Sequence, residues 1–153
     1  MAQAKLRFRT TPNPDSMDGQ FFVQHMLACK VTVEGDETVK LWDIPADVLI
    51  TEVITWVETV LDGTTPLINV GSDSEDDPDN FCNDADGATV NTVVLSRDSL
   101  APAGVHYPTG GSVWAKVSST GSDCDAGVFL VLIEYINLAD VLASPNFSYT
   151  IAE

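Results

Sequence analysis

Residues 48–61, VLITEVITWVETVL, constrain the fold more than any other part of the chain. Many of these residues are β-branched, and such stiff side chains favour the pleated surface of a strand. A helical stripe through the same stretch is formed by Leu49, Ile50, Val53, Ile54, Val57, Val60 and Leu61. Periodicity alone therefore leaves strand and helix open. The β-branched content favours the strand.

Asp62-Gly63 follows directly, and a second apolar run, LINVG at residues 67–71, comes after Pro66. Asp-Gly between two apolar runs is typical of a β-hairpin, because glycine accepts a positive φ without steric cost. We therefore predict that residues 44–81 form a paired β unit at the centre of the domain.

Further strands are predicted along the rest of the chain, at residues 21–33, 39–42, 89–95, 112–119 and 126–137. In the fourth of these, Val113, Ala115 and Val117 alternate with more polar residues, as in a half-buried strand. The last is apolar on both sides, which suits a central strand covered on both faces. Strands joined by Gly- and Asp-rich loops predict an all-β fold, an antiparallel β-sandwich of which the jelly roll is one form.

The first residues look different from the rest. Lys5, Arg7 and Arg9 alternate with Leu6 and Phe8, which is the period of a strand, and two prolines that block helix formation follow. One reading is a frayed terminus. The other is an arm that adds a strand or ion pairs to a neighbouring subunit. We expect an extended arm at residues 1–19, a sandwich at 20–143 and a short tail at 144–153.

The formal net charge of the 153-residue chain is −16, and three of its seven basic residues lie in that arm. Nucleic-acid binding depends on clustered lysine and arginine, so a nucleic-acid partner is not expected. The sequence lacks an apolar run of the ~20 residues that span a bilayer, and its start lacks the apolar centre of a signal peptide. We expect synthesis in a cytoplasm and no membrane partner.

An acidic stretch, residues 72–86, holds seven acids, Asp73, Glu75, Asp76, Asp77, Asp79, Asp84 and Asp86. A solvated loop is the expected structure. Calcium binding is the alternative, because calcium prefers several carboxylate oxygens around one point, but the distal glutamate of an EF-hand is missing. The three cysteines have no metal-site spacing and are expected as free thiols, with a Cys82–Cys124 bridge left open.

Signatures of catalysis are missing from the sequence: it has no GxSxG, P-loop, HExxH or dinucleotide fingerprint. No enzyme activity, cofactor or metal site is expected. His25 lies in an apolar run and is expected in the core or at a subunit contact. Trp42, Trp56 and Trp114 could form a sugar platform, which keeps a carbohydrate-binding module as an alternative function.

Residues 48–81, VLITEVITWVETVLDGTTPLINVGSDSEDDPDNF, and 111–137, GSVWAKVSSTGSDCDAGVFLVLIEYIN, resemble small β-sandwich structural proteins of tailed bacteriophages. In those proteins a strand near a DG turn is followed by a short strand ending in VG and an acidic loop. An apolar strand ending in tyrosine then closes the domain, as the strand ending near Tyr135 does here. The resemblance spans about residues 44–137 and leaves residues 1–43 uncovered.

The resemblance implies a virion structural protein, most of all a capsid decoration (cement) protein that is homotrimeric and sits on the outer capsid surface. Its partner would be the major capsid protein. The arm residues Lys5, Leu6, Arg7, Phe8 and Arg9 would then contact the capsid across a capsomer boundary. A tail, fibre or other virion sandwich is the alternative within the same class.

Overall fold

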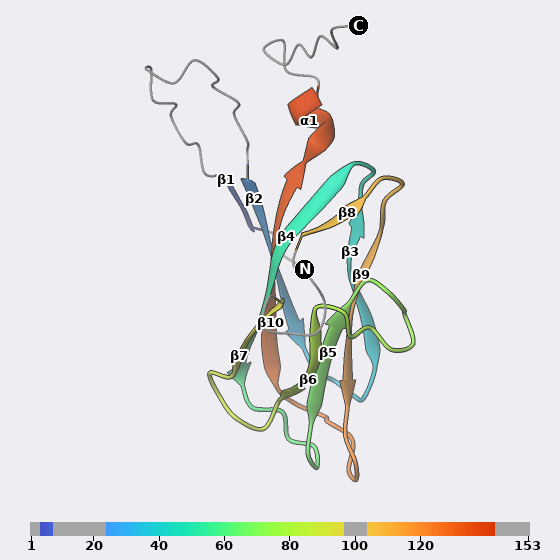
Figure 1. Ribbon diagram of the computed structural model, residues 1–153. Coiled ribbons are helices and arrows are strands. Elements are labelled where there is room, and N and C mark those ends of the chain that lie inside the picture. The colour runs from blue at the N-terminus through green and yellow to red at the C-terminus, as the bar shows by residue number, and fades with distance from the viewer. Residues whose placement is uncertain (1–3, 8–23, 97–103, 143–153) are drawn as a thin grey trace, which may run out of the picture.

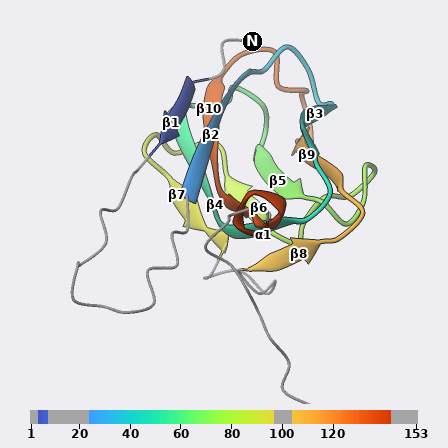
Figure 2. The same ribbon diagram turned by 90° about the horizontal axis from the view of Figure 1, so that it is seen from above.

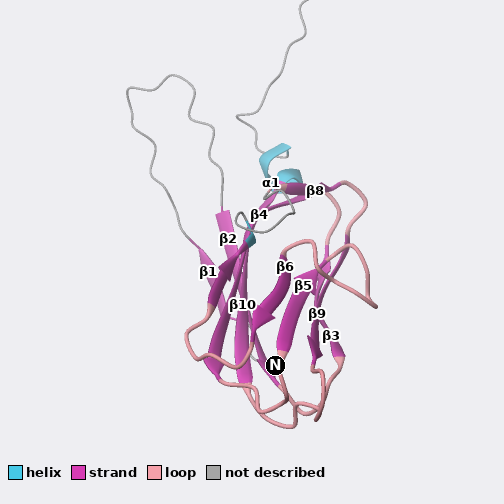
Figure 3. Cartoon of the chain, turned by 60° about the horizontal axis from the view of Figure 1, so that its bottom comes forward, coloured by secondary structure: helices cyan, strands magenta, loops and turns pink. Residues whose placement is uncertain are grey.

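The computed structural model describes residues 4–7, 24–96 and 104–142. Within them the chain forms ten strands and one short helix (Figures 1 and 3). The elements are β1 (Ala4–Arg7), β2 (Gln24–Thr32), β3 (Thr38–Ile44), β4 (Val48–Thr59), β5 (Leu67–Gly71), β6 (Cys82–Asp86), β7 (Val93–Leu95), β8 (Val105–Tyr107), β9 (Gly111–Ser118), β10 (Val128–Asn137) and α1 (Leu138–Leu142). None of the helices among these residues is long and apolar enough to cross a membrane. The tail at 144–153 lies outside the described residues.

Two antiparallel sheets face each other, as the view from above in Figure 2 shows. The six-stranded sheet has the order β1-β2-β10-β4-β7, with β8 pairing the other end of β4, and the four-stranded sheet has the order β3-β9-β5-β6. Strands β2 to β5 alternate between the sheets. Without β1 and β8, the orders 2-10-4-7 and 3-9-5-6 are those of a jelly roll built from two Greek keys. The predicted all-β sandwich is confirmed.

The strand prediction for residues 48–61 is confirmed in β4, and its ambiguous periodicity has a local cause. Glu134 of β10 pairs with Glu52, but the next residue, Tyr135, pairs with Ile50. Thr51 is therefore an extra residue, a β-bulge that shifts the inward-facing set by one position. Ile50 and Val53 are both buried although they are three residues apart, which mimics a helical spacing.

The predicted hairpin at Asp62-Gly63 is wrong, because β4 and β5 lie in different sheets. The turn carries the chain from one layer to the other. The turn is held by the loop before β10. The backbone N–H groups of Asp125 (2.8 Å) and Ala126 (2.9 Å) in that loop donate hydrogen bonds to Asp62 Oδ1 of the turn. Gly63 is required for space: a Cβ there would overlap Cys124 Sγ.

Between the sheets lies one apolar core whose largest fully buried side chains include Phe81 and Phe129. Strands β9 and β10 show why the sequence folds this way. Val113, Ala115 and Val117 point inward, as predicted, and so do Phe129, Val131 and Ile133 of β10. Each large buried side chain stabilises the fold by roughly 1.5–3 kcal/mol relative to exposure. This burial is what fixes the two layers together.

Three other predictions need correction. The stretch at 72–86 is a loop only in part, because its end forms edge strand β6. Residues 105–107, where no strand was predicted, form β8 on the edge beside β4. Strand β10 is central, as expected, but in the described chain only one of its faces is fully covered: residues 130, 132 and 134 are half-buried.

Candidate interaction surfaces

The arm forms a strand in its described part. Residues 4–7 make β1, which pairs antiparallel with β2 of the same chain, with Lys5 opposite Leu27 and Arg7 opposite His25. Lys5, Leu6 and Arg7 therefore lie at the edge of the six-stranded sheet, whereas Phe8 and Arg9 lie outside the described residues. The pairing demonstrates that this segment can extend a sheet edge. Its contact with a capsid stays a prediction.

His25 sits inside the fold, as expected for a core histidine, with 6% of its surface exposed. Its ring stacks on that of Tyr135 of β10 at a centroid distance of 5.0 Å, and the ring centroids of Trp42 of β3 and Tyr135 are 4.8 Å apart. Because β2 and β10 belong to one sheet and β3 to the other, the three rings join the two layers. These ring contacts pack the two sheets against each other.

The three tryptophans do not share a platform. Trp42 packs against the core. Trp114 lies on the outer side of the four-stranded sheet, where Lys40 Nζ is 4.9 Å from its ring centroid. Trp56 lies on the outer side of the six-stranded sheet, with its Nε1 donating to Asn91 Oδ1 (3.4 Å). A sugar ring needs aromatic faces on one surface, so this arrangement does not favour a three-tryptophan carbohydrate site.

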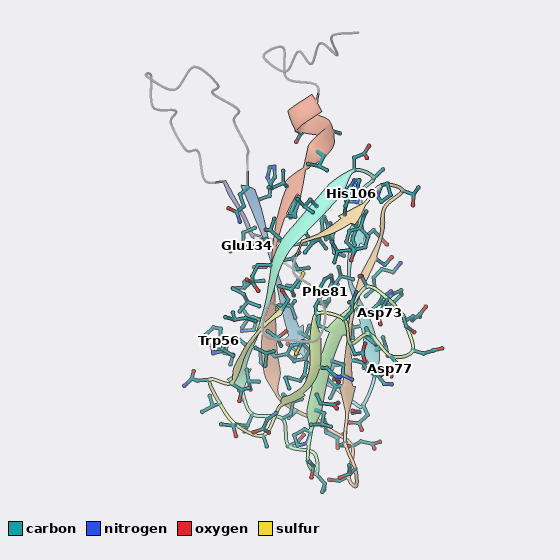
Figure 4. The ribbon with its side chains drawn as sticks, viewed as in Figure 1. Trp56, Asp73, Asp77, Phe81, His106 and Glu134 are labelled. Carbon is teal, nitrogen blue, oxygen red and sulfur yellow. The ribbon has the colours of Figure 1, made fainter. Side chains whose placement is uncertain are left out.

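The acidic loop is held by its own polar groups. Asp73 Oδ1 accepts from the backbone N–H groups of Asp79 (3.3 Å) and Asn80 (3.4 Å). Asn80 Oδ1 accepts from the N–H of Ser72 (2.8 Å). Lys116 of β9 donates to the Asp76 carbonyl (2.6 Å). The loop is thereby fastened to the outer side of the four-stranded sheet, where Figure 4 shows Asp73 and Asp77.

Charge repulsion is concentrated at one residue of this loop. Desolvation, followed by the neighbouring carboxylates of Asp73, Asp77 and Asp84, raises the pKa of Asp79. Among the described residues, no group of three or more His, Cys, Asp or Glu side chains is placed to hold a metal ion. The Asp73 carboxylate instead serves as an acceptor for backbone donors, which is a structural use.

The cysteines are all free and buried. Burial raises the pKa of the Cys82 thiol to about 11 and also raises the pKa of Cys29 and Cys124. Thiols of this kind are poor nucleophiles at neutral pH because the thiolate is the reactive form. The Cys82–Cys124 bridge left open by the sequence is not formed.

The outer face of the six-stranded sheet carries apolar residues, whereas the sequence pattern predicts that β10 is covered on both faces. Figure 4 shows Trp56 and Glu134 on the side away from the four-stranded sheet, with Phe81 between the layers. Around them, apolar side chains from four strands are half-buried or exposed. The apolar residues at alternate positions of β10, together with those of β4, were the available signal.

The fold is that of an antiparallel β-sandwich with jelly-roll strand order. It is similar to a chain of the acidic stable capsid structure of Helicobacter pylori bacteriophage KHP30, with a TM-score of 0.57 and 12% identity over 87% of this chain and 93% of that one. It is also similar to a chain of the cyanophage Pam1 capsid asymmetric unit, with a TM-score of 0.54 and 13% identity over 84% and 93%. No protein-family model and no curated protein matches the sequence.

Proposed function

We propose that this chain is a structural protein of a bacteriophage virion. The observation that carries the proposal is the shared fold: two chains from phage capsid structures match it over nearly their whole length and nearly all of this one. A fold alone does not define a function.

Within the virion, we propose a decoration (cement) role. The protein would bind the outer surface of the major capsid protein lattice as a homotrimer and stabilise the head by adding buried area at lattice joints. Binding to the assembled state alone shifts the equilibrium toward it. The acidic body repels nucleic acid and so suits an outer position. Residues 1–19 would supply an arm that clips to the capsid.

The arm provides the test. Deleting residues 1–15 should lower occupancy on capsids purified without this protein by at least about tenfold, because the paired backbone and the basic side chains are lost together. The free protein should keep its melting temperature within a few degrees, because β1 contributes only an edge strand of four residues. Measurements of capsid occupancy and of thermal unfolding check both.

A matched variant separates charge from strand pairing. Replacing Lys5, Arg7 and Arg9 by alanine should give a smaller loss of occupancy, which added salt should reproduce in the wild type because exposed charges are screened. If the truncated chain decorates capsids as well as the full chain, the arm is not the clip. If the full chain leaves capsids bare at micromolar concentration, the decoration role itself is wrong.

A further inference from the structure

An apolar belt crosses the outer face of the six-stranded sheet. Its residues are Ala28, Ile54, Trp56, Val93, Leu95, Leu130 and Leu132. The registers align them in two rows. Leu132 pairs with Ala28 on one side and Ile54 on the other, and Ile54 pairs with Leu95. Leu130 likewise lies beside Trp56, which pairs with Val93. Directly paired residues of a sheet share a face.

Polar groups border the belt, and the acids among these border groups have partners. At one end Lys30 Nζ lies 2.7 Å from Glu58 Oε2, an ion pair that bridges β2 and β4 across β10. At the other end Glu134 accepts from Gln24 Nε2 (2.8 Å), and Glu52 accepts from Ser96 Oγ (3.0 Å). An apolar centre with a polar, hydrogen-bonded rim is the anatomy of a protein–protein interface.

The size of this face suits a stable contact. Strands β2, β10 and β4, with 9, 10 and 12 residues, and the three-residue β7 lie ~4.8 Å apart with ~3.3 Å per residue, which gives a face of roughly 540 Å² in projection. A standard interface buries ~800 Å² of accessible surface per partner, and accessible area exceeds the projected area. Val93 is 55% exposed, and the aromatic Trp56 is of the type that dominates binding energy at interface centres.

Charge indicates which partner fits. The chain has a net charge of −16, so two copies repel each other over most of their surfaces. The belt itself carries no charged residue, and the border carboxylates of Glu58, Glu134 and Glu52 already accept from Lys30, Gln24 and Ser96. Contact at the belt is therefore apolar, and a second copy offers an equally apolar face. Around a rotation axis, each copy presents the same face.

We propose that the apolar belt is the contact between copies of this chain, turned toward the axis of the oligomer. This inference rests on the proposed homo-oligomer and specifies the surface that forms it. The four-stranded sheet then remains on the outside, where the acidic loop already covers part of it through Lys116. Copies would therefore meet through the less charged of the two sheet faces.

The test compares two leucines in opposite sheets. Leu132 is half-buried in the belt, and Leu67 of β5 is half-buried on the outer side of the four-stranded sheet, opposite Ser118. Leu132→Asp should raise the dissociation constant of the oligomer at least about thirtyfold, since a charge would enter the contact. Leu67→Asp should leave it within about threefold. Sedimentation equilibrium of the full-length chains measures both.

Circular dichroism of each variant controls for folding. Should Leu132→Asp fail to fold, Ala28→Arg, a change at the border strand β2, replaces it with the same expectation. A wild-type chain that stays monomeric at 100 μM (about ten times a ~10 μM dissociation constant) overturns the proposal. So does a folded Leu132→Asp or Ala28→Arg chain that still assembles like the wild type.

Capsid binding, measured in parallel, separates this inference from the proposed function. An oligomer that Leu132→Asp dissociates, but that never binds capsids, supports the contact and rejects the decoration role. A chain that decorates capsids while its Leu132→Asp variant stays oligomeric and loses capsid binding rejects the contact and assigns the belt to the capsid. A monomer that decorates capsids also rejects the contact.

Discussion

The outer faces of the two sheets differ in composition, because one is polar and the other is apolar. Both belong to antiparallel sheets whose inner faces are buried in one core. On the four-stranded sheet the outer face is polar: Lys40 lies over Trp114, Ser112 donates to Asp43 Oδ1 (3.1 Å), and the acidic loop is tied to Lys116. On the six-stranded sheet the outer face carries the apolar belt, and no described segment crosses it.

This difference shows that the alternation of apolar and polar residues along a strand indicates what its outer face contacts. A strand with a solvated outer face alternates apolar and polar residues, as β9 does. In β10 the outward positions hold Leu130 and Leu132, and β4 adds Ile54 and Trp56 beside them. A sheet face of this composition fits contact with another molecule better than contact with water. The prediction that β10 is covered on both faces is therefore met only on its inner face in the described chain.

Substitutions of Trp56 and Trp114 should show the largest difference between the two outer faces. Trp56→Ala should weaken self-association at least about tenfold, because aromatic anchors at interface centres carry much of the binding energy. Trp114→Ala should leave association unchanged and lower the free energy of unfolding by about 1 kcal/mol, through the lost contact with Lys40 and lost packing. Sedimentation equilibrium and urea unfolding measure the two effects. Equal effects on association would show that the two faces are equivalent.

A change at the joint between the sheets should affect stability alone. Asp36, in the turn between β2 and β3, accepts hydrogen bonds from Ser119 N (2.7 Å), Ser119 Oγ (2.6 Å) and Cys124 N (2.9 Å) in the loop between β9 and β10. Asp36→Ala should lower the free energy of unfolding by ~1–2 kcal/mol without changing self-association. Urea unfolding is the measurement, and Glu34→Ala in the same turn is the control.

The pH dependence of that difference has a defined sign. Desolvation acts to raise the pKa of Asp36, but the hydrogen bonds from Ser119 and Cys124 outweigh it and lower the pKa. A carboxyl with a lowered pKa stabilises the fold above its unfolded value of ~3.9, and this contribution is lost as the pH falls through the folded value. The stability difference between wild type and Asp36→Ala should therefore begin to shrink below pH ~4 and vanish below the folded pKa of Asp36. A gap that persists there would assign the effect to packing.

The sheets were predictable from the sequence where burial alternates regularly. Strand β9 follows its predicted pattern residue by residue. Strand β4 was predictable from its β-branched content, but the bulge at Thr51 was not, because a single extra residue is set by pairing with β10. The Asp62-Gly63 turn was misassigned because a local hairpin signal cannot distinguish a return within one sheet from a crossing between sheets. Glycine is needed at position 63 because Cys124, which is distant in sequence, approaches it closely.

Surfaces were less predictable than layers. Recognising the apolar belt requires knowing which strands are neighbours in the sheet. Strand β10 lies between β2 and β4 but is far from both in sequence. Strand β6 was hidden because Cys82 and Ala85 are its only buried residues. Strand β8 has three residues, too few for a period to be recognised. The strand at residues 4–7 could be recognised from its alternation, whereas its pairing with β2 depends on where β2 lies in the sheet.

The smallest expected effects belong to the acidic loop, the most highly charged part of the polar side. Its repulsion should make Asp79→Asn slightly more stable, with a melting temperature higher by about 1–2 °C at pH 7. The pKa of Asp79 is raised by desolvation and by its acidic neighbours. The folded state therefore loses stability as the pH rises through that pKa, and the asparagine variant escapes the loss. The gain should shrink in 0.5 M NaCl.

Asp123→Asn is the matched control, because it removes one exposed acid from the loop between β9 and β10 and changes the net charge equally. A similar rise in both variants would attribute the gain to net charge rather than to crowding around Asp79. EDTA and calcium should each leave the melting temperature of the wild type unchanged, since Asp73 already binds the backbone N–H groups of Asp79 and Asn80. A drop of several degrees in EDTA, restored by calcium, would instead show that the loop binds the ion.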